Sequence, residues 1–140
     1  MTLLRCALVL AFCCVGVLTG VGQEPGAKGK PEGAQSKIAG VWRGHSECTD
    51  KNSPCHDEVN VYRFTKVEGK SNSFSVTASK IVDGKEIVMG SGEWKYDEKK
   101  QTLECEKPPI RMFVEGDKME GALTLADGSV YRRIYLKKES

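Results

Sequence analysis

The sequence predicts an all-β domain, a single antiparallel up-and-down barrel of eight strands. Three observations predict it. After Ile38, turn signals recur about every ten residues, which is the spacing of small β domains. The segments between the turns alternate in polarity or are rich in β-branched and aromatic residues. Finally, no window of about a dozen residues carries the 3.6-residue period of an amphipathic helix.

The turns fix the expected strands. Asp83-Gly84 and Asp127-Gly128 are pairs that favour two-residue hairpin turns, because such turns need positive φ angles. Gly69 and Gly116 mark two further turns for the same steric reason. The predicted strands span residues 38–48, 57–66, 73–82, 85–96 (with a bend), 101–106, 110–115, 118–125 and 129–137. Such short connections leave no room for crossover helices. They favour a barrel, which removes the sheet edges, over a β-sandwich, which usually needs longer Greek-key connections.

The chain before the first strand is predicted to lie outside the barrel. Arg5 precedes an almost unbroken apolar run that ends at Val21, and a polar stretch follows. This pattern is typical of a secretory signal peptide at residues 1–22, with a membrane anchor or a lipidated cysteine as alternatives. Residues 23–37 are rich in Gly, Pro, Lys and Glu and are predicted to form a disordered linker. The barrel domain then spans residues 38–140 of a secreted or periplasmic protein.

Alternation along the strands assigns side chains to the inside of the barrel. In the second strand the larger Tyr62 and Phe64 are placed inside in preference to Val59 and Val61. In the seventh strand Leu125 is placed inside together with Met119. An eight-stranded barrel is just wide enough for side chains to fill it or for one small ligand. The residues that would line such a ligand pocket are Tyr62, Phe64, Phe74, Trp94, Met112 and Leu123.

Two short motifs lie in the first and last strands. The first is Gly40-Val41-Trp42 and the second is Tyr131-Arg132-Arg133-Ile134. Through Gly40-x-Trp42 and either Arg132 or Arg133, the chain resembles the lipocalin-like (calycin) barrels, in which a Gly-x-Trp on the first strand packs against an arginine on the last. The resemblance implies that Gly40, Trp42 and Arg132 close the barrel, with the Arg132 guanidinium over the indole of Trp42 in a cation–π contact. It also implies a small apolar ligand, although the domain is shorter than typical lipocalins and has no sign of their C-terminal helix.

A second resemblance concerns a cysteine-flanked loop. Through Cys48-Thr49-Asp50 and Cys55-His56-Asp57-Glu58, the domain is similar to small secreted bacterial proteins of uncharacterised function. Removal of the signal peptide leaves Cys48, Cys55 and Cys105, and an oxidising compartment favours one disulfide and one thiol. A Cys48–Cys55 disulfide is predicted, with Cys105 buried beside Leu103. Pairing of Cys105 with either of the other two remains the alternative.

No catalytic residues, metal site or cofactor are predicted. A zinc site at His45, Cys48, Cys55 and His56 is disfavoured, because the spacing matches no standard finger and thiolates oxidise outside the cell. The triplet His56-Asp57-Glu58 invites a catalytic interpretation, but the sequence places no partner groups around it. A polar loop is the simpler interpretation.

The expected function is that of a non-enzymatic barrel that binds a small hydrophobic molecule. With 21 basic and 19 acidic residues and no basic stripe, nucleic acid is not expected as a partner. We expect a monomer, with no stable membrane insertion once the signal peptide is cleaved. The alternative is a protein-interaction module similar to small periplasmic protease inhibitors, acting through residues 23–37 as an N-terminal arm.

Overall fold

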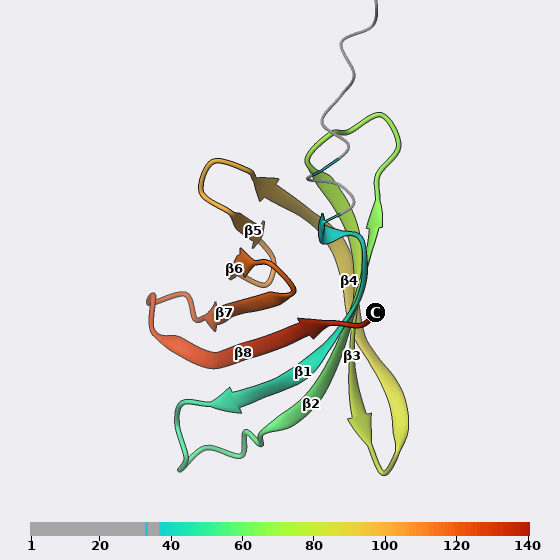
Figure 1. Cartoon of the computed structure of the whole chain (residues 1–140). Helices are drawn as coiled ribbons and strands as arrows, with labels where there is room; N and C mark the ends of the chain where they lie inside the picture. Colours follow the sequence, from blue (N-terminus) through green and yellow to red (C-terminus); the bar gives the residue numbers. More distant parts are fainter. Residues whose placement is uncertain (1–32, 34–36) are drawn as a thin grey trace, which may run out of the picture.

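The fold is a closed antiparallel barrel of eight strands, as predicted (Figure 1). The computed structural model describes Gly33 and residues 37–140, so the predicted signal peptide and most of the predicted linker lie outside the described residues. Each strand pairs with the next, and the last pairs with the first. The strands are β1 (Gly40–Cys48), β2 (Glu58–Lys66), β3 (Ser73–Val82), β4 (Lys85–Asp97), β5 (Thr102–Cys105), β6 (Ile110–Glu115), β7 (Lys118–Thr124) and β8 (Val130–Lys138).

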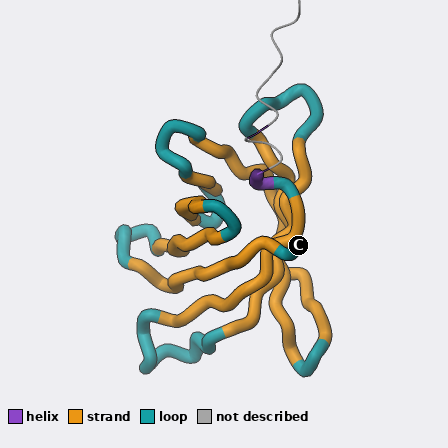
Figure 2. Tube along the Cα trace, viewed as in Figure 1, coloured by secondary structure: helices purple, strands orange, loops and turns teal. Residues whose placement is uncertain are grey.

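Strands and short turns make up nearly all of the described chain (Figure 2). The predicted strands 73–82 and 110–115 match β3 and β6, and the other boundaries move by one or two residues. The bend expected in the fourth strand is a β-bulge. Ala78 pairs with Gly90 and Ser79 with Val88, which leaves Met89 as the extra residue of β4.

The first part of β4 pairs along one edge with β3, and its pairing with β5 begins at Lys95. Because β5 is only four residues long, it stops well short of the start of β4. Residues 85–93 are exposed as a result. The β3–β4 hairpin therefore projects beyond the barrel wall, at the lower right of Figure 1.

The core contains the inward set that alternation predicts in β2 and β3. Tyr62 and Phe64 are buried, whereas Val59 is 46% exposed. Val61 was also expected to be outside, but it is fully buried, although it does not belong to the core cluster. One prediction in β7 is wrong. Leu125 was expected inside, but it is 48% exposed, because β7 ends at Thr124 and its register with β8 shifts just before that residue.

Trp42 fills one end of the barrel. Its side chain is fully buried, its Nε1 donates to the carbonyl oxygen of Ile38 at 2.9 Å, and Phe64 meets it edge-on at 6.4 Å between ring centroids. The β1–β8 seam runs beside it. At Gly44 an added Cβ would lie 1.8 Å from the carbonyl oxygen of Tyr135, so the two strands approach more closely than any side chain permits.

The cation over Trp42 is Lys138, and the predicted contact with Arg132 is wrong. The Lys138 Nζ lies 5.8 Å from the centre of the Trp42 ring, and Trp42 pairs with Lys138 in the β1–β8 ladder. Arg132 pairs with Cys48, six residues further along β1, which is about 20 Å at the usual strand rise. Both basic residues point inward, because they share the parity of β8, but the register of the ladder sends them to opposite ends of the barrel.

The predicted disulfide is present. Cys48 and Cys55 are bonded, and Cys105 is a buried free thiol. The bridge closes the β1–β2 loop at the end of the barrel opposite Trp42. Its carboxylate neighbour Asp57 accepts a hydrogen bond from the backbone N–H of Cys48 at 2.8 Å. This loop therefore forms a fixed rim around the open end.

Candidate functional site

The candidate site is a cavity of about 370 Å³ inside the barrel, at the end away from Trp42. A volume of this size falls within the range of small-molecule pockets, which is roughly 300–1,000 Å³. Its wall is contributed by inward side chains of most strands. The main apolar residues that line it are Tyr62, Val76, Trp94, Ile110, Leu123 and Ile134.

The structure divides the six predicted lining residues into two groups. Tyr62, Trp94 and Leu123 border the cavity. Phe64, Phe74 and Met112 are also inside the barrel, but they do not border the cavity. Tyr62 and Trp94 belong to the same buried core and lie where it meets the cavity. Trp94 joins the two groups, since its ring meets Tyr62 at 5.9 Å and Phe64 at 5.8 Å in edge-on contacts. Alternation finds inward residues, but it cannot say at what height along the barrel the packing ends.

One wall of the cavity is formed by the part of β4 that pairs with β3 alone. Met89, Gly90 and Gly92 border the cavity there. A Cβ added at Gly90 or Gly92 would meet nothing within 4 Å, and neither residue has a positive φ. The two glycines therefore leave space that side chains would otherwise occupy.

A polar cluster lies at the rim of the cavity around Arg132. One terminal nitrogen of Arg132 donates to Ser46 Oγ at 2.7 Å and to Glu58 Oε2 at 3.1 Å. The other donates to the carbonyl oxygen of His56 at 2.9 Å and to Cys55 Sγ at 3.1 Å. Arg132 thus ties β8 to β1, to β2 and to the disulfide loop.

Glu58 and Asn60 are cavity residues that sequence reasoning missed. Both border the cavity, and Asn60 is only 2% exposed. Within the described chain, the buried Oδ1 of Asn60 accepts no hydrogen bond. The available signal was parity, because residues 58 and 60 share the face of Tyr62 in β2. Because both residues are polar, they were not expected inside the barrel, although parity placed them there.

Charges at the rim are arranged around two carboxylates. Glu58 accepts from Lys80 at 3.2 Å through Oε1, in addition to its contact with Arg132. The hydrogen bond from the backbone of Cys48, together with that from Lys51, holds the pKa of Asp57 below its ordinary value of 3.8. Inside the cavity, burial raises the pKa of Tyr62 to about 12, so its hydroxyl stays protonated.

The other sites considered from the sequence have structural roles here. Cys48 and Cys55 are bonded to each other in the disulfide, so they are not available as thiolate ligands of a zinc ion. Across the described residues, no group of three His, Cys, Asp or Glu side chains is placed to hold a metal ion. In the triplet considered for catalysis, Asp57 fixes the loop, Glu58 pairs with Arg132, and the carbonyl group of His56 accepts from Arg132.

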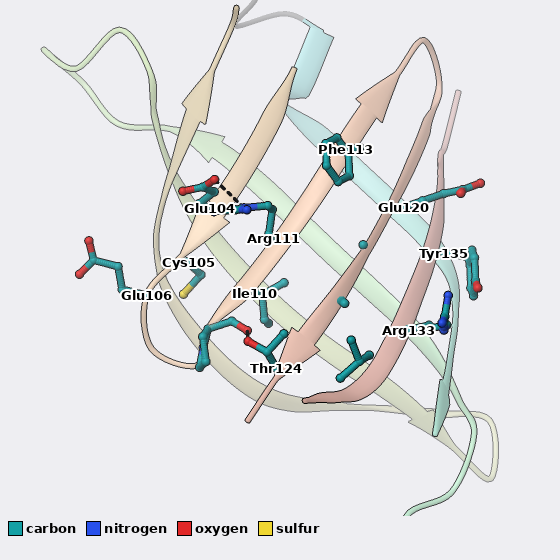
Figure 3. A pocket seen from close by; sticks show the side chains of 14 residues that line it. Glu104, Cys105, Glu106, Ile110, Arg111, Phe113, Glu120, Thr124, Arg133 and Tyr135 are labelled. Carbon is teal, nitrogen blue, oxygen red and sulfur yellow. Dashed lines mark hydrogen bonds and ion pairs between the residues drawn. The ribbon is translucent and has the colours of Figure 1, made fainter. Parts of the chain in front are cut away.

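A second hollow lies on the outer face of β5 to β8, with a volume of about 610 Å³ (Figure 3). Glu104, Arg111 and Phe113 stand on the solvent side of the sheet, and Glu104 and Arg111 form an ion pair of 2.8 Å. Cys105 and Ile110 also border the hollow, but they are core residues. Phe113, 59% exposed, and Arg133 border it. This hollow is an open groove between exposed side chains, whereas the interior cavity offers buried apolar walls. We therefore take the interior cavity as the candidate site.

Comparisons with protein-family models, with curated proteins and with solved structures found no match for this chain. Among the described residues, no helix is both long enough and apolar enough to cross a membrane.

Proposed function

We propose that this protein is a secreted or periplasmic, lipocalin-like barrel that binds a small apolar molecule in its interior cavity. The observation that carries the proposal is the cavity of about 370 Å³, bounded by Tyr62, Trp94 and other apolar side chains. A filled barrel would have argued for a purely structural role. The disulfide agrees with an oxidising compartment. No catalytic step is proposed.

Fluorescence of Trp94 supplies the binding assay. This residue borders the cavity, while Trp42 is buried at the other end, so a ligand-induced change that disappears in Trp94→Phe reports on the cavity. Titration with a panel of apolar molecules (alkanols, fatty acids, retinoids and haem) should change the emission for at least one class. No change across the panel would contradict the proposal.

Gly92→Leu provides a matched test of where the ligand binds. Gly92 pairs with the inward Val76, and an added Cβ there meets open space, so a leucine side chain would occupy the cavity without backbone strain. We expect this variant to lose at least ten-fold in affinity while its melting temperature is unchanged or higher. Ser75→Leu, on the exposed face of the neighbouring strand, should bind as the unmodified protein does. Equal binding by Gly92→Leu would place the ligand elsewhere.

A further inference from the structure

At the polar end of the cavity, both terminal nitrogens of Arg132 already have hydrogen-bond acceptors. Arg132 carries four protons on its two terminal nitrogens, and each nitrogen has two acceptors within hydrogen-bond distance. Its side chain is only 12% exposed. A ligand carboxylate could therefore bind the two terminal nitrogens of Arg132 only by displacing Glu58, Ser46, the carbonyl group of His56 or Cys55 Sγ.

The positive charge of Arg132 also has a negative partner, the carboxylate of Glu58. Glu58 Oε2 lies 3.1 Å from it, so a second carboxylate brought to the same place would face an existing negative charge in a partly buried setting. Two lysines add positive charge, and one of them contacts Glu58 directly, so Arg132 and Lys80 together outnumber this one carboxylate. Lys80 holds the other oxygen of Glu58, and Lys107 borders the cavity as an exposed side chain. Water screens a charge such as that of Lys107 more strongly than it screens the Arg132–Glu58 pair.

Asn60 and Tyr62 lie further along β2 from the rim than Glu58, and they offer hydrogen-bonding groups of their own. Asn60 Oδ1 is buried and accepts nothing from the rest of the described chain, so it lacks a donor. Buried polar atoms are almost always paired, so this atom needs a hydrogen-bond donor from whatever fills the cavity. Tyr62, two residues along the same face of β2, carries a protonated hydroxyl that can donate. A group that both donates and accepts would satisfy the two residues together.

We propose that the cavity binds neutral amphiphiles, whose apolar body packs against Trp94 and whose hydroxyl or primary amide head hydrogen-bonds to Asn60 and Tyr62, and that Glu58 keeps ligand carboxylates from Arg132 by occupying it. This inference rests on the proposed function, because it names the class of ligand that the same cavity selects. An ionised carboxylate has no proton to donate to Asn60, whereas an alcohol has one. The specificity therefore follows from the hydrogen-bond inventory and from the charge of Glu58.

The test compares ligands that differ only in the head group. Dodecanol, dodecanamide and dodecanoate are titrated against the full protein at neutral pH, with Trp94 emission as the readout. We expect the alcohol and the amide to bind at least ten-fold more tightly than the carboxylate. Dodecanoate binding as tightly as dodecanol would overturn the inference and leave the proposed function intact. Binding of none of the three, or of the general panel, would instead overturn the proposed function.

Two variants locate the selectivity. Glu58→Gln keeps the size of the side chain and removes its charge, so dodecanoate should gain at least ten-fold relative to dodecanol. Glu104→Gln removes a carboxylate from the outer groove and serves as the matched control, with no change in preference expected. Asn60→Leu should weaken dodecanol more than dodecanoate. An unchanged preference in a folded Glu58→Gln protein would overturn the role of Glu58, and the comparison in the unmodified protein stands without any variant.

Discussion

The two ends of this barrel use the same strands for different purposes. At one end the indole of Trp42 is fully buried beneath Lys138 and beside Ile38 and Phe64. At the other end Trp94 and Tyr62 border a cavity, and the polar groups of Arg132, Glu58 and Asn60 take the place of apolar packing. The difference teaches that dense packing is confined to one end of the barrel, whereas the β1–β8 seam is held at both ends, at the cavity end by the bond from Arg132 to Ser46.

The largest expected effect is on the packed end. Trp42→Ala should lower the free energy of unfolding by about 3–5 kcal/mol, which is typical of large core truncations. Trp94→Ala should cost clearly less, because one side of that ring already faces a cavity and has fewer contacts to lose. Urea unfolding of both variants measures the contrast. Equal losses would mean that the two ends are packed alike.

Removal of the disulfide should have the next largest effect on stability, and it acts on the open end of the barrel. Replacing Cys48 and Cys55 by serine should lower the free energy of unfolding by about 2–3 kcal/mol, as expected for closure of a short loop. Ligand affinity should fall with it, because Arg132 and the rim rest on this loop. Thermal unfolding and fluorescence titration measure the two losses. Ser75→Ala, on the exposed face of β3, is the control for affinity. A double variant that stays stable and binds normally would show that the rim does not depend on the disulfide.

The smallest effect is electrostatic, and acid abolishes it. The pKa of Asp57 is held below 3.8 in the folded protein, so its contribution to stability is fully present above that pH. It is lost as the pH falls through the lowered folded pKa. Asp57→Asn should therefore be less stable than the unmodified protein above pH 3.8, with the gap closing in stronger acid. Asp83→Asn, an exposed carboxyl in the β3–β4 turn, is the control for unfolding measured across pH. A gap that does not depend on pH would assign the effect of Asp57→Asn to the altered hydrogen bond instead of to the charge.

Much of the fold followed from local chemistry. Asp83-Gly84 and its counterparts fix the hairpins, and alternation places Tyr62 and Phe64 inside, since both signals act over a few residues. The partner of Trp42 could not be found in this way. The choice between Arg132 and Lys138 depends on the register of the β1–β8 ladder, which joins the two ends of the domain and leaves no local trace.

The candidate site was predicted in part for a similar reason. Tyr62, Trp94 and Leu123 were chosen as large inward residues and do border the cavity. Phe64, Phe74 and Met112 met the same criterion and lie in the core. Polar residues such as Glu58 and Asn60 do not stand out in a search for apolar lining, although parity places them on the inward face. The cavity is defined by where packing stops, which is a property of the whole barrel.

The β1–β8 seam also governs when this protein can fold. Arg43 in β1 bonds to Glu139, which lies 96 residues later in the chain. Contacts between such distant residues require a large loop to close before they stabilise anything, and proteins rich in them fold slowly. During synthesis β1 has to wait for β8 to leave the ribosome before the barrel can close. Until then the edges of β1 and β7 are unpaired, and the nascent chain is at its most exposed to aggregation.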